Sequence, residues 1–266
     1  MKLKKIFYTI EIYILLIFII FAFFSKYSLF QNINLETTES LVAPNSEHIL
    51  GTDDLGFDIF SQLIYGGRIS LEISFFTAIF SAIGGSILGT IAGYFGGWKD
   101  KILLSIIDIF LSIPELPLMI VLGAFLGTNL KNIIFVLVLV TWTRPAKIAR
   151  NEIIKLKNEK YILLSKAYGG KFFHIFRWHL LKPMWSIILT AIVKIMNKAI
   201  LAEASLAYLG LGDPLSKSWG MIISRAMSFP NIYFTEYYEW WLLPPLILLI
   251  ILVVTLASLG EKLEKL

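Results

Sequence analysis

The segment from residue 160 to residue 183, KYILLSKAYGGKFFHIFRWHLLKP, gathers charged side chains and glycines inside an otherwise apolar sequence. Its Gly169-Gly170-Lys171 triplet invites comparison with phosphate-binding loops, which follow a strand and need the pattern G-x-x-x-x-G-K-[ST]. Ser165 stands where the first glycine of that pattern belongs, and Phe172 stands where the final hydroxyl residue belongs. No strand pattern precedes the triplet, so the sequence excludes nucleotide binding by this segment.

Three carboxylates within long apolar runs are the other candidates for a chemical role: Asp108, Glu115 and Glu203. A carboxylate inside a bilayer is costly and often functional, so each is a candidate for lining a transport pathway or a gate. The alternative for each is a structural acid that pairs with a nearby base. Pro114 and Pro117 flank Glu115 and are expected to bend its helix.

Metal-binding side chains are sparse. The chain has no cysteine, which excludes a disulfide framework and a thiolate metal site. The three histidines, His48, His174 and His179, all fall outside the apolar runs. We therefore expect no metal site and no cofactor in this chain.

The composition defines the class of protein. Hydrophobic residues make up 57% of the 266 residues and charged residues only 16%, whereas soluble domains are near 45–50% and about 25%. A soluble fold of this size could not bury so much apolar surface, so we predict an integral membrane protein. Six apolar runs are long enough to cross a bilayer, at about 6–24, 71–96, 102–126, 130–149, 184–208 and 241–259.

The charges predict the orientation. Ten basic and two acidic residues lie between Arg144 and Lys182, whereas six acids and two bases lie between Ser25 and Ser70. Because basic loops stay in the cytoplasm, six spans with both termini cytoplasmic place residues 160–183 inside and residues 25–70 and 210–240 outside. The positive net charge then reflects membrane topology, and we expect no nucleic-acid partner.

The first apolar run has a rival interpretation as a cleaved signal peptide. It follows a basic start, but the run from Ile6 to Phe24 exceeds a usual signal core and no A-x-A site follows it. We interpret it as a retained transmembrane helix.

Glycines recur every fourth residue in the second span, at Gly85, Gly89, Gly93 and Gly97. This spacing places them on one helix face, where a second helix can approach closely. Close packing within this chain is the favoured interpretation, and a subunit interface is the alternative.

Residues 160–183 are predicted to form two short helices joined by a glycine turn. Glycine tolerates the positive φ that ends a helix, so Gly169-Gly170 marks the turn. Helical spacing places apolar side chains on one face of each helix: Tyr161, Leu164 and Tyr168 with Ser165 on the first, Phe172, Phe173, Phe176 and Leu180 on the second. The pair could lie on the anionic membrane surface or dock a cytoplasmic partner, and this pattern favours neither.

Two further stretches form ordered motifs around this segment. HILGTDDLGFDIFSQLIYGGRISL, residues 48–71, precedes the second span, and ILAEASLAYLGLGDPLSKSWG, residues 200–220, ends the fifth. Together with residues 160–183 they resemble the permease subunits of ATP-binding-cassette importers of the dipeptide/oligopeptide/nickel family. In the family's cytoplasmic E-A-A-x-x-x-G loop, Leu163, Leu164 and Ser165 stand at E-A-A and Gly169 at the glycine. Phe57 stands where the family usually has an arginine.

The resemblance implies an all-α, six-span permease fold of the type I importers. It divides the chain into residues 1–70, an N-terminal helix with an extracytoplasmic segment, and residues 71–266, a five-helix core with a coupling loop at about 151–182. It implies import of di- or oligopeptides or of nickel, free or chelated, across a bacterial or archaeal cytoplasmic membrane. The implied partners are a second permease in a heterodimer, two ATPases that bind ATP and magnesium, and an extracytoplasmic substrate-binding protein. This chain itself would not be an enzyme.

The resemblance also implies roles for particular residues. The ATPase-coupling candidates are Tyr161, Lys166, Ala167, Gly169, Gly170 and His179. The candidates that face the binding protein are Asp53, Asp54, Asp58, Arg68, Asp213 and Trp219. The alternative for the GTDDLG stretch is a simple turn bounded by Gly51 and Gly56. The alternative for the whole chain is a secondary transporter driven by ions or protons through Asp108, Glu115 or Glu203.

Overall fold

The computed structural model describes residues 11–20 and 39–265. Within these ranges the protein is almost entirely helical, and its only β pairing is an isolated bridge between Thr52 and Asp58. This confirms the all-α prediction. The helices are Glu11–Ile20, α2 (Ile59–Phe95), α3 (Gly97–Ser112), α4 (Glu115–Leu126), α5 (Leu130–Thr141), α6 (Thr143–Leu156), α7 (Lys160–Ala167), α8 (Phe172–Ile175), α9 (Leu181–Tyr208), α10 (Trp219–Ser228) and α11 (Leu243–Glu264). Short π-helical segments, η2 (Phe176–Leu180) and η4 (Tyr238–Leu242), lead into α9 and α11, and η3 (Ile232–Phe234) is a 3₁₀ turn.

Four continuous helical stretches are long and apolar enough to cross a bilayer: Ile59–Phe95, Leu130–Leu156, Phe172–Tyr208 and Tyr238–Glu264. A fifth exists if α3 and α4 count as one span, but they are bent by 92°. The bend expected from Pro114 and Pro117 is therefore confirmed, and it divides the predicted span over 102–126 into two helices. Ile113 is extended there because it precedes Pro114, which disfavours helical backbone at that residue. Of the predicted first span, residues 11–20 are helical and the rest lies outside the described residues.

The second span begins twelve residues earlier than predicted, at Ile59 rather than at 71. The side chain of Asp58 caps this helix by accepting a hydrogen bond from the backbone N–H of Ser61 at 2.8 Å. Arg68 consequently lies within α2 rather than in a loop, and the predicted domain boundary after residue 70 falls inside the helix.

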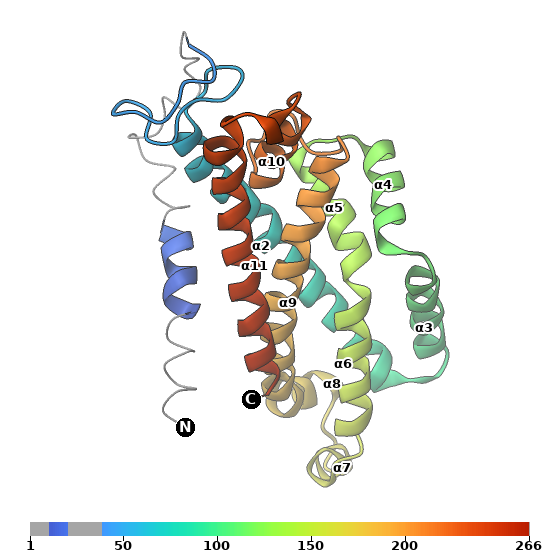
Figure 1. The fold of residues 1–266 in the computed structure, drawn as a ribbon. Coiled ribbons are helices and arrows are strands. Elements are labelled where there is room, and N and C mark those ends of the chain that lie inside the picture. Colours follow the sequence, from blue (N-terminus) through green and yellow to red (C-terminus); the bar gives the residue numbers. More distant parts are fainter. Residues whose placement is uncertain (1–10, 21–38, 266) are drawn as a thin grey trace.

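Helix α2 crosses the bundle obliquely and packs along α6 and α9 (Figure 1). Three of the spaced glycines make the α6 contact possible, because a Cβ at Gly85, Gly89 or Gly93 would lie 2.1–2.7 Å from a backbone oxygen of α6 or of Trp142, which precedes it. The interpretation of close packing within this chain is thus confirmed for these three. Gly97 differs, since it begins α3 and nothing lies within 4 Å of its Cβ position.

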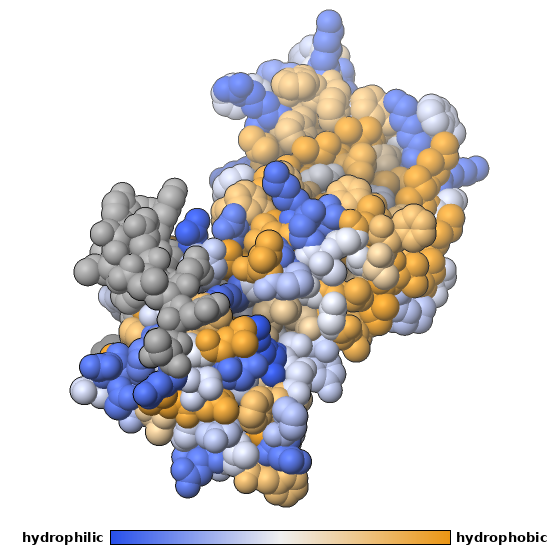
Figure 2. All heavy atoms as spheres, turned by 90° about the horizontal axis from the view of Figure 1, so that it is seen from above, coloured by the Kyte–Doolittle hydropathy of each residue, from blue (hydrophilic) through white to orange (hydrophobic). Residues whose placement is uncertain are grey.

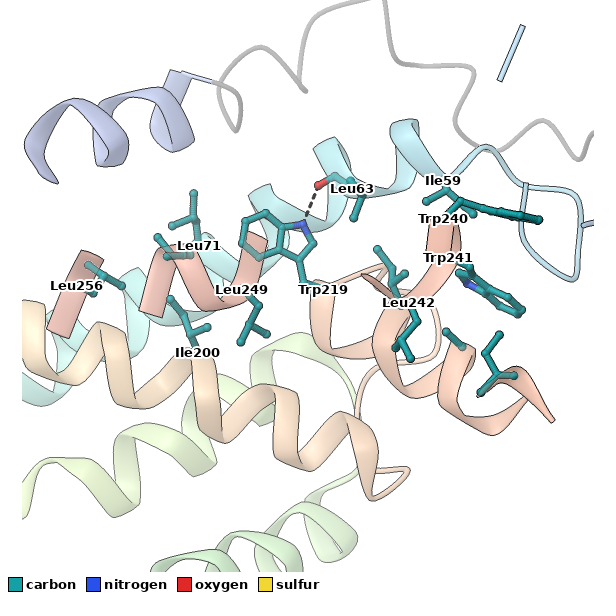
Figure 3. Close-up of a cluster of buried hydrophobic side chains, with 14 residues drawn as sticks. Ile59, Leu63, Leu71, Ile200, Trp219, Trp240, Trp241, Leu242, Leu249 and Leu256 are labelled. Carbon is teal, nitrogen blue, oxygen red and sulfur yellow. Dashed lines mark hydrogen bonds between the residues drawn. The ribbon is translucent and has the colours of Figure 1, made fainter. Parts of the chain in front are cut away.

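The largest buried cluster joins α2, α9, α10 and α11. Figure 3 shows Trp219 at its centre, where the indole N–H donates to the carbonyl of Leu63 at 2.8 Å. Trp241 is completely buried in the same cluster. The start of α10 is therefore fixed against the first turns of α2.

The two ends of the bundle differ. Residues 39–58 and α10 lie at one end, which we call the α10 end, and α7, α8 and the last turn of α11 lie toward the other, the α7 end (Figure 1). Seen from the α10 end, hydrophilic patches alternate with broad hydrophobic flanks (Figure 2). Apolar flanks of this kind fit a protein surrounded by lipid.

Candidate functional site

The segment at the α7 end has the predicted helix–turn–helix form. α7 ends at Ala167, and Gly169 adopts a φ of 83°, the left-handed conformation that glycine favours. The backbone N–H groups of Gly169 and Gly170 donate to the carbonyls of Lys166 and Ser165 at 2.9 and 2.8 Å. A Cβ at Gly170 would lie 2.7 Å from the Ser165 carbonyl oxygen, so both glycines are needed for this turn.

This segment is fixed to the spans by side chains that the sequence did not single out. Ile162 of α7 and Ile175 of α8 are completely buried, together with Ile153 of α6 and Met184 of α9. Ile162 was missed because it lies in the apolar run Tyr161–Leu164, where eight helical residues are too few to define one buried face. We call Ile153, Ile162, Ile175 and Met184 the anchor. Their packing fixes the segment firmly to α6 and α9.

The predicted apolar face of α7 points away from this anchor. Tyr161, Leu164 and Tyr168 of this face are 44%, 57% and 89% exposed, and the neighbouring Leu163 is 50% exposed. We call these four residues the α7 apolar surface. A cluster of large exposed apolar side chains at a polar end of a membrane protein is typical of an interaction site.

The other coupling candidates lie around the α7 apolar surface. The Lys166 ammonium lies 4.8 Å from the ring centroid of Tyr94 on α2, and the His179 ring lies 5.7 Å from that of Tyr161. Ala167 is exposed. The structure therefore places the coupling candidates within one helix–turn–helix segment, in α7, the glycine turn and η2: Tyr161, Lys166, Ala167, Gly169, Gly170 and His179.

The three intramembrane carboxylates occupy different environments. Asp108 is 67% exposed and lies 3.9 Å from the Lys147 ammonium. Glu115 at the start of α4 forms ion pairs with Lys198 of α9 and, at 3.7 Å, with Arg144 of α6. These pairs link α4 to two other helices just beyond the break at residue 113.

Glu203 is a buried contact between α9 and α10. It is 2% exposed and accepts a hydrogen bond from the Ser218 hydroxyl at 2.5 Å, while that hydroxyl oxygen caps α10 through the N–H of Met221. A Cβ at Gly220 would lie 3.1 Å from the Glu203 carboxylate, so glycine permits this close approach. This geometry favours the structural interpretation of Glu203.

We expect Glu203→Ala to destabilise the protein by about 1–3 kcal/mol, because the Ser218 hydroxyl loses its buried acceptor. Glu203→Gln keeps an acceptor oxygen in the same place and should lose less. Thermal unfolding of the three purified proteins in detergent measures the difference. Equal unfolding temperatures for the alanine variant and the wild type would contradict this assignment.

At the α10 end, two of the predicted docking residues are unsuitable as direct contacts. Asp53 is fully buried and accepts hydrogen bonds from the N–H groups of Leu55 and Phe57 and from the side-chain amide of Gln62, at 2.8–2.9 Å. Trp219 is 2% exposed. The prediction of a surface role for these two residues is therefore wrong, because a turn and the core require them.

The remaining candidates at this end are partly exposed. Asp54 lies 3.8 Å from Arg225 of α10, and Asp58 contacts His48 at 3.1 Å in addition to capping α2. The Asp213 side chain accepts from the Leu215 N–H at 3.0 Å in the loop before α10. Asp54, Asp58 and Asp213 thus make local contacts and are still partly exposed to solvent.

Burial shifts two ionisable groups at the α10 end. It raises the pKa of Asp54 above its usual range, although the Arg225 guanidinium opposes this shift. It lowers the pKa of Lys217, whose ammonium lies 3.3 Å from the ring centroid of Phe57. In both groups burial favours the neutral form over the charged one.

We expect Asp53→Ala to destabilise the loop of residues 39–58 by roughly 2–4 kcal/mol, because three donors lose one shared acceptor. Limited proteolysis should cleave this loop faster in the variant. Glu47→Ala is the matched control, since Glu47 is exposed in the same loop. Identical cleavage rates for both variants would contradict the role of Asp53.

Comparison with known proteins identifies the class. The family described as "Binding-protein-dependent transport system inner membrane component" matches residues 85–264. The chain belongs to this family. It is therefore a multi-pass membrane protein, in agreement with its apolar spans.

Individual proteins similar to this chain are named for the transport of peptides. The chain is 34% identical over 192 residues to the dipeptide transport system permease protein DppC of Bacillus subtilis, covering 71% of this chain and 60% of that protein. It is 33% identical over 240 residues to the oligopeptide permease protein OppC of the same organism, covering 90% and 76%. The glutathione permease protein GsiD of Pectobacterium atrosepticum is 31% identical, covering 70% and 62%. The chain thus spans about three-fifths of the length of the DppC relative.

A solved structure shares the fold. The inward-facing MetNI methionine ABC transporter aligns with a TM-score of 0.60 and 21% identity, covering 76% of this chain and 94% of that one. This likeness supports the type I importer permease fold.

Proposed function

We propose that this chain is one permease half of an ATP-driven, binding-protein-dependent importer of peptides. The observation that carries the proposal is family membership over residues 85–264 together with relatives named for dipeptide, oligopeptide and glutathione transport. None of these relatives is named for nickel, so peptides are the favoured substrate class. No feature of the comparisons supports the alternative of an ion-coupled secondary transporter.

The α7 apolar surface is the proposed ATPase-docking site. It is exposed, it lies at the end of the molecule that carries the basic residues between Arg144 and Lys182, and its anchor ties it to α6 and α9. A movement imposed on α7 would pass through Ile162 and Ile175 to two spans. ATP and magnesium would be bound by the partner ATPases, so this chain would couple to hydrolysis without performing it.

The orientation follows from the same charges. The positive-inside rule places the α7 end in the cytoplasm, with both termini on that side, and the α10 end outside. The α10 end would then receive substrate from an extracytoplasmic binding protein through Asp54, Asp58 and Asp213. A second permease, in a heterodimer, would complete the pathway.

Co-expression of this chain with its second permease and candidate ATPases tests the proposal. A cysteine introduced at Tyr168, in a chain that has none, should crosslink to an ATPase in the purified complex. A cysteine at Leu215, which is 91% exposed at the α10 end, serves as the control and should not crosslink. Absence of any bound ATPase would contradict the proposal.

A further inference from the structure

Two charged residues on α2 have no partner in the part of the chain that the structure describes. Arg68 and Glu72 are one helical turn apart and partly buried, and neither forms an ion pair or side-chain hydrogen bond there, even with the other. Arginine before glutamate is also the less favourable order for a pair at this spacing. Both charged groups therefore remain available to a ligand.

The residues between and beside Arg68 and Glu72 pack into the core of the bundle. Ser70, between them, accepts a hydrogen bond from the buried N–H of Trp219 at 3.1 Å. Ile69 and Ile73 pack in a buried cluster with Met119 and Leu137 of α4 and α5. Because unpaired charges facing hydrocarbon are costly, the face with Arg68 and Glu72 must meet water or another polar group in the assembled protein.

A groove continues this face toward the α7 end. Phe76, one turn beyond Glu72, and Phe80 have rings stacked at 6.1 Å and are 39% and 56% exposed. They line an open groove of about 330 Å³ between α2 and α5. The opposite wall is formed by Lys131, Ile134, Phe135 and Val138. We call Arg68, Glu72, Phe76 and Phe80 of α2 and the facing wall of α5 the α2–α5 face. It combines two cations, Arg68 and Lys131, with one anion and aromatic rings.

We infer that the α2–α5 face is where this chain contacts a zwitterionic peptide during passage. The Glu72 carboxylate is complementary to the peptide's ammonium group, the Arg68 guanidinium to its carboxylate, and the two phenylalanines to its side chains. The inference rests on the proposed function. A second permease seated here would bury both charges in an interface, and interface cores are depleted of charged residues.

Cysteine labelling tests whether the α2–α5 face is accessible to water. The assembled complex of both permeases, the ATPases and the binding protein is reconstituted in proteoliposomes with Phe76→Cys as its only cysteine in this chain. A charged, water-soluble thiol reagent should modify this cysteine, and peptide-loaded binding protein with ATP should suppress the labelling. Val254→Cys, 59% exposed on α11, is the control for a lipid-facing position and should not react. An unreactive Phe76→Cys would overturn the inference.

Charge removal tests the ligand chemistry. At saturating peptide-loaded binding protein, Arg68→Gln and Glu72→Gln should each lower the rate of dipeptide uptake at least about tenfold, the loss expected when one charged hydrogen bond is removed. Both variant complexes should retain the second permease and the ATPases on purification. Lys101→Gln and Glu261→Gln, both at exposed residues elsewhere, are matched controls and should transport normally.

The outcomes separate the possible failures. A wild-type complex without ATP-dependent peptide uptake overturns the proposed function and this inference with it. Normal uptake by the wild type and by both charge variants overturns this inference alone. Loss of the second permease from the variants during purification assigns the charges to a subunit interface and also overturns it.

Discussion

Replacing Leu164 by glutamate is expected to abolish transport while leaving the fold intact. Leu164 is 57% exposed on the α7 apolar surface, so the new carboxylate meets water in the isolated chain. In the complex it would be buried without a partner against the ATPase, at a cost of about 3 kcal/mol, or roughly a hundredfold in affinity. ATPase co-purification and peptide uptake should both be lost, with an unchanged unfolding temperature.

Leu215→Glu is the matched control for this experiment. Leu215 is an exposed leucine, but it lies in the loop before α10, at the other end of the bundle. This variant should retain its ATPases. If Leu164→Glu also retains them at wild-type stoichiometry, the α7 apolar surface is not the docking site.

Gly89→Ala is expected to destabilise the whole bundle. A Cβ at this position would lie 2.1 Å from the Ala146 carbonyl oxygen and 3.0 Å from the Arg150 nitrogen, and backbone atoms of α6 cannot rotate aside. Overpacking of this kind costs about 1–3 kcal/mol. If α2 moves away from α6 to make room, the other contacts between the two helices weaken as well, and the loss of stability increases. We expect the unfolding temperature in detergent to fall by roughly 5 °C.

Gly84→Ala provides the comparison on the same helix. Nothing lies within 4 Å of the Cβ position at Gly84, so the added methyl group meets open space. Alanine also favours helix over glycine, and this variant should unfold at the wild-type temperature or slightly above it. An equal loss of stability in both variants would contradict the glycine-mediated contact between α2 and α6.

Local patterns predicted the parts of the fold that depend on a few neighbouring residues. The glycine pair after Tyr168 predicted the turn, because no other residue adopts its φ as easily. The fourfold spacing of Gly85, Gly89 and Gly93 predicted a close helix contact. Long apolar runs located most of the spans.

Features that depend on distant residues could not be predicted in this way. Glu115 pairs with Arg144 of α6 and Lys198 of α9, which are far from it in the sequence. The resemblance implied that Asp53 faces the binding protein, whereas the turn needs its carboxylate for two backbone N–H groups. The anchor residue Ile162 stood among equally apolar neighbours, so only the packed structure distinguishes it.

The central claim is that this chain passes peptide across the membrane under the control of ATPases docked at α7. The most direct measurement is uptake of a labelled dipeptide into proteoliposomes that contain both permeases, the ATPases and the binding protein. We predict uptake that requires ATP, persists when ion and proton gradients are collapsed, and is lost with Leu164→Glu. Uptake driven by an ion or proton gradient, through this chain without any ATPase, would contradict the account.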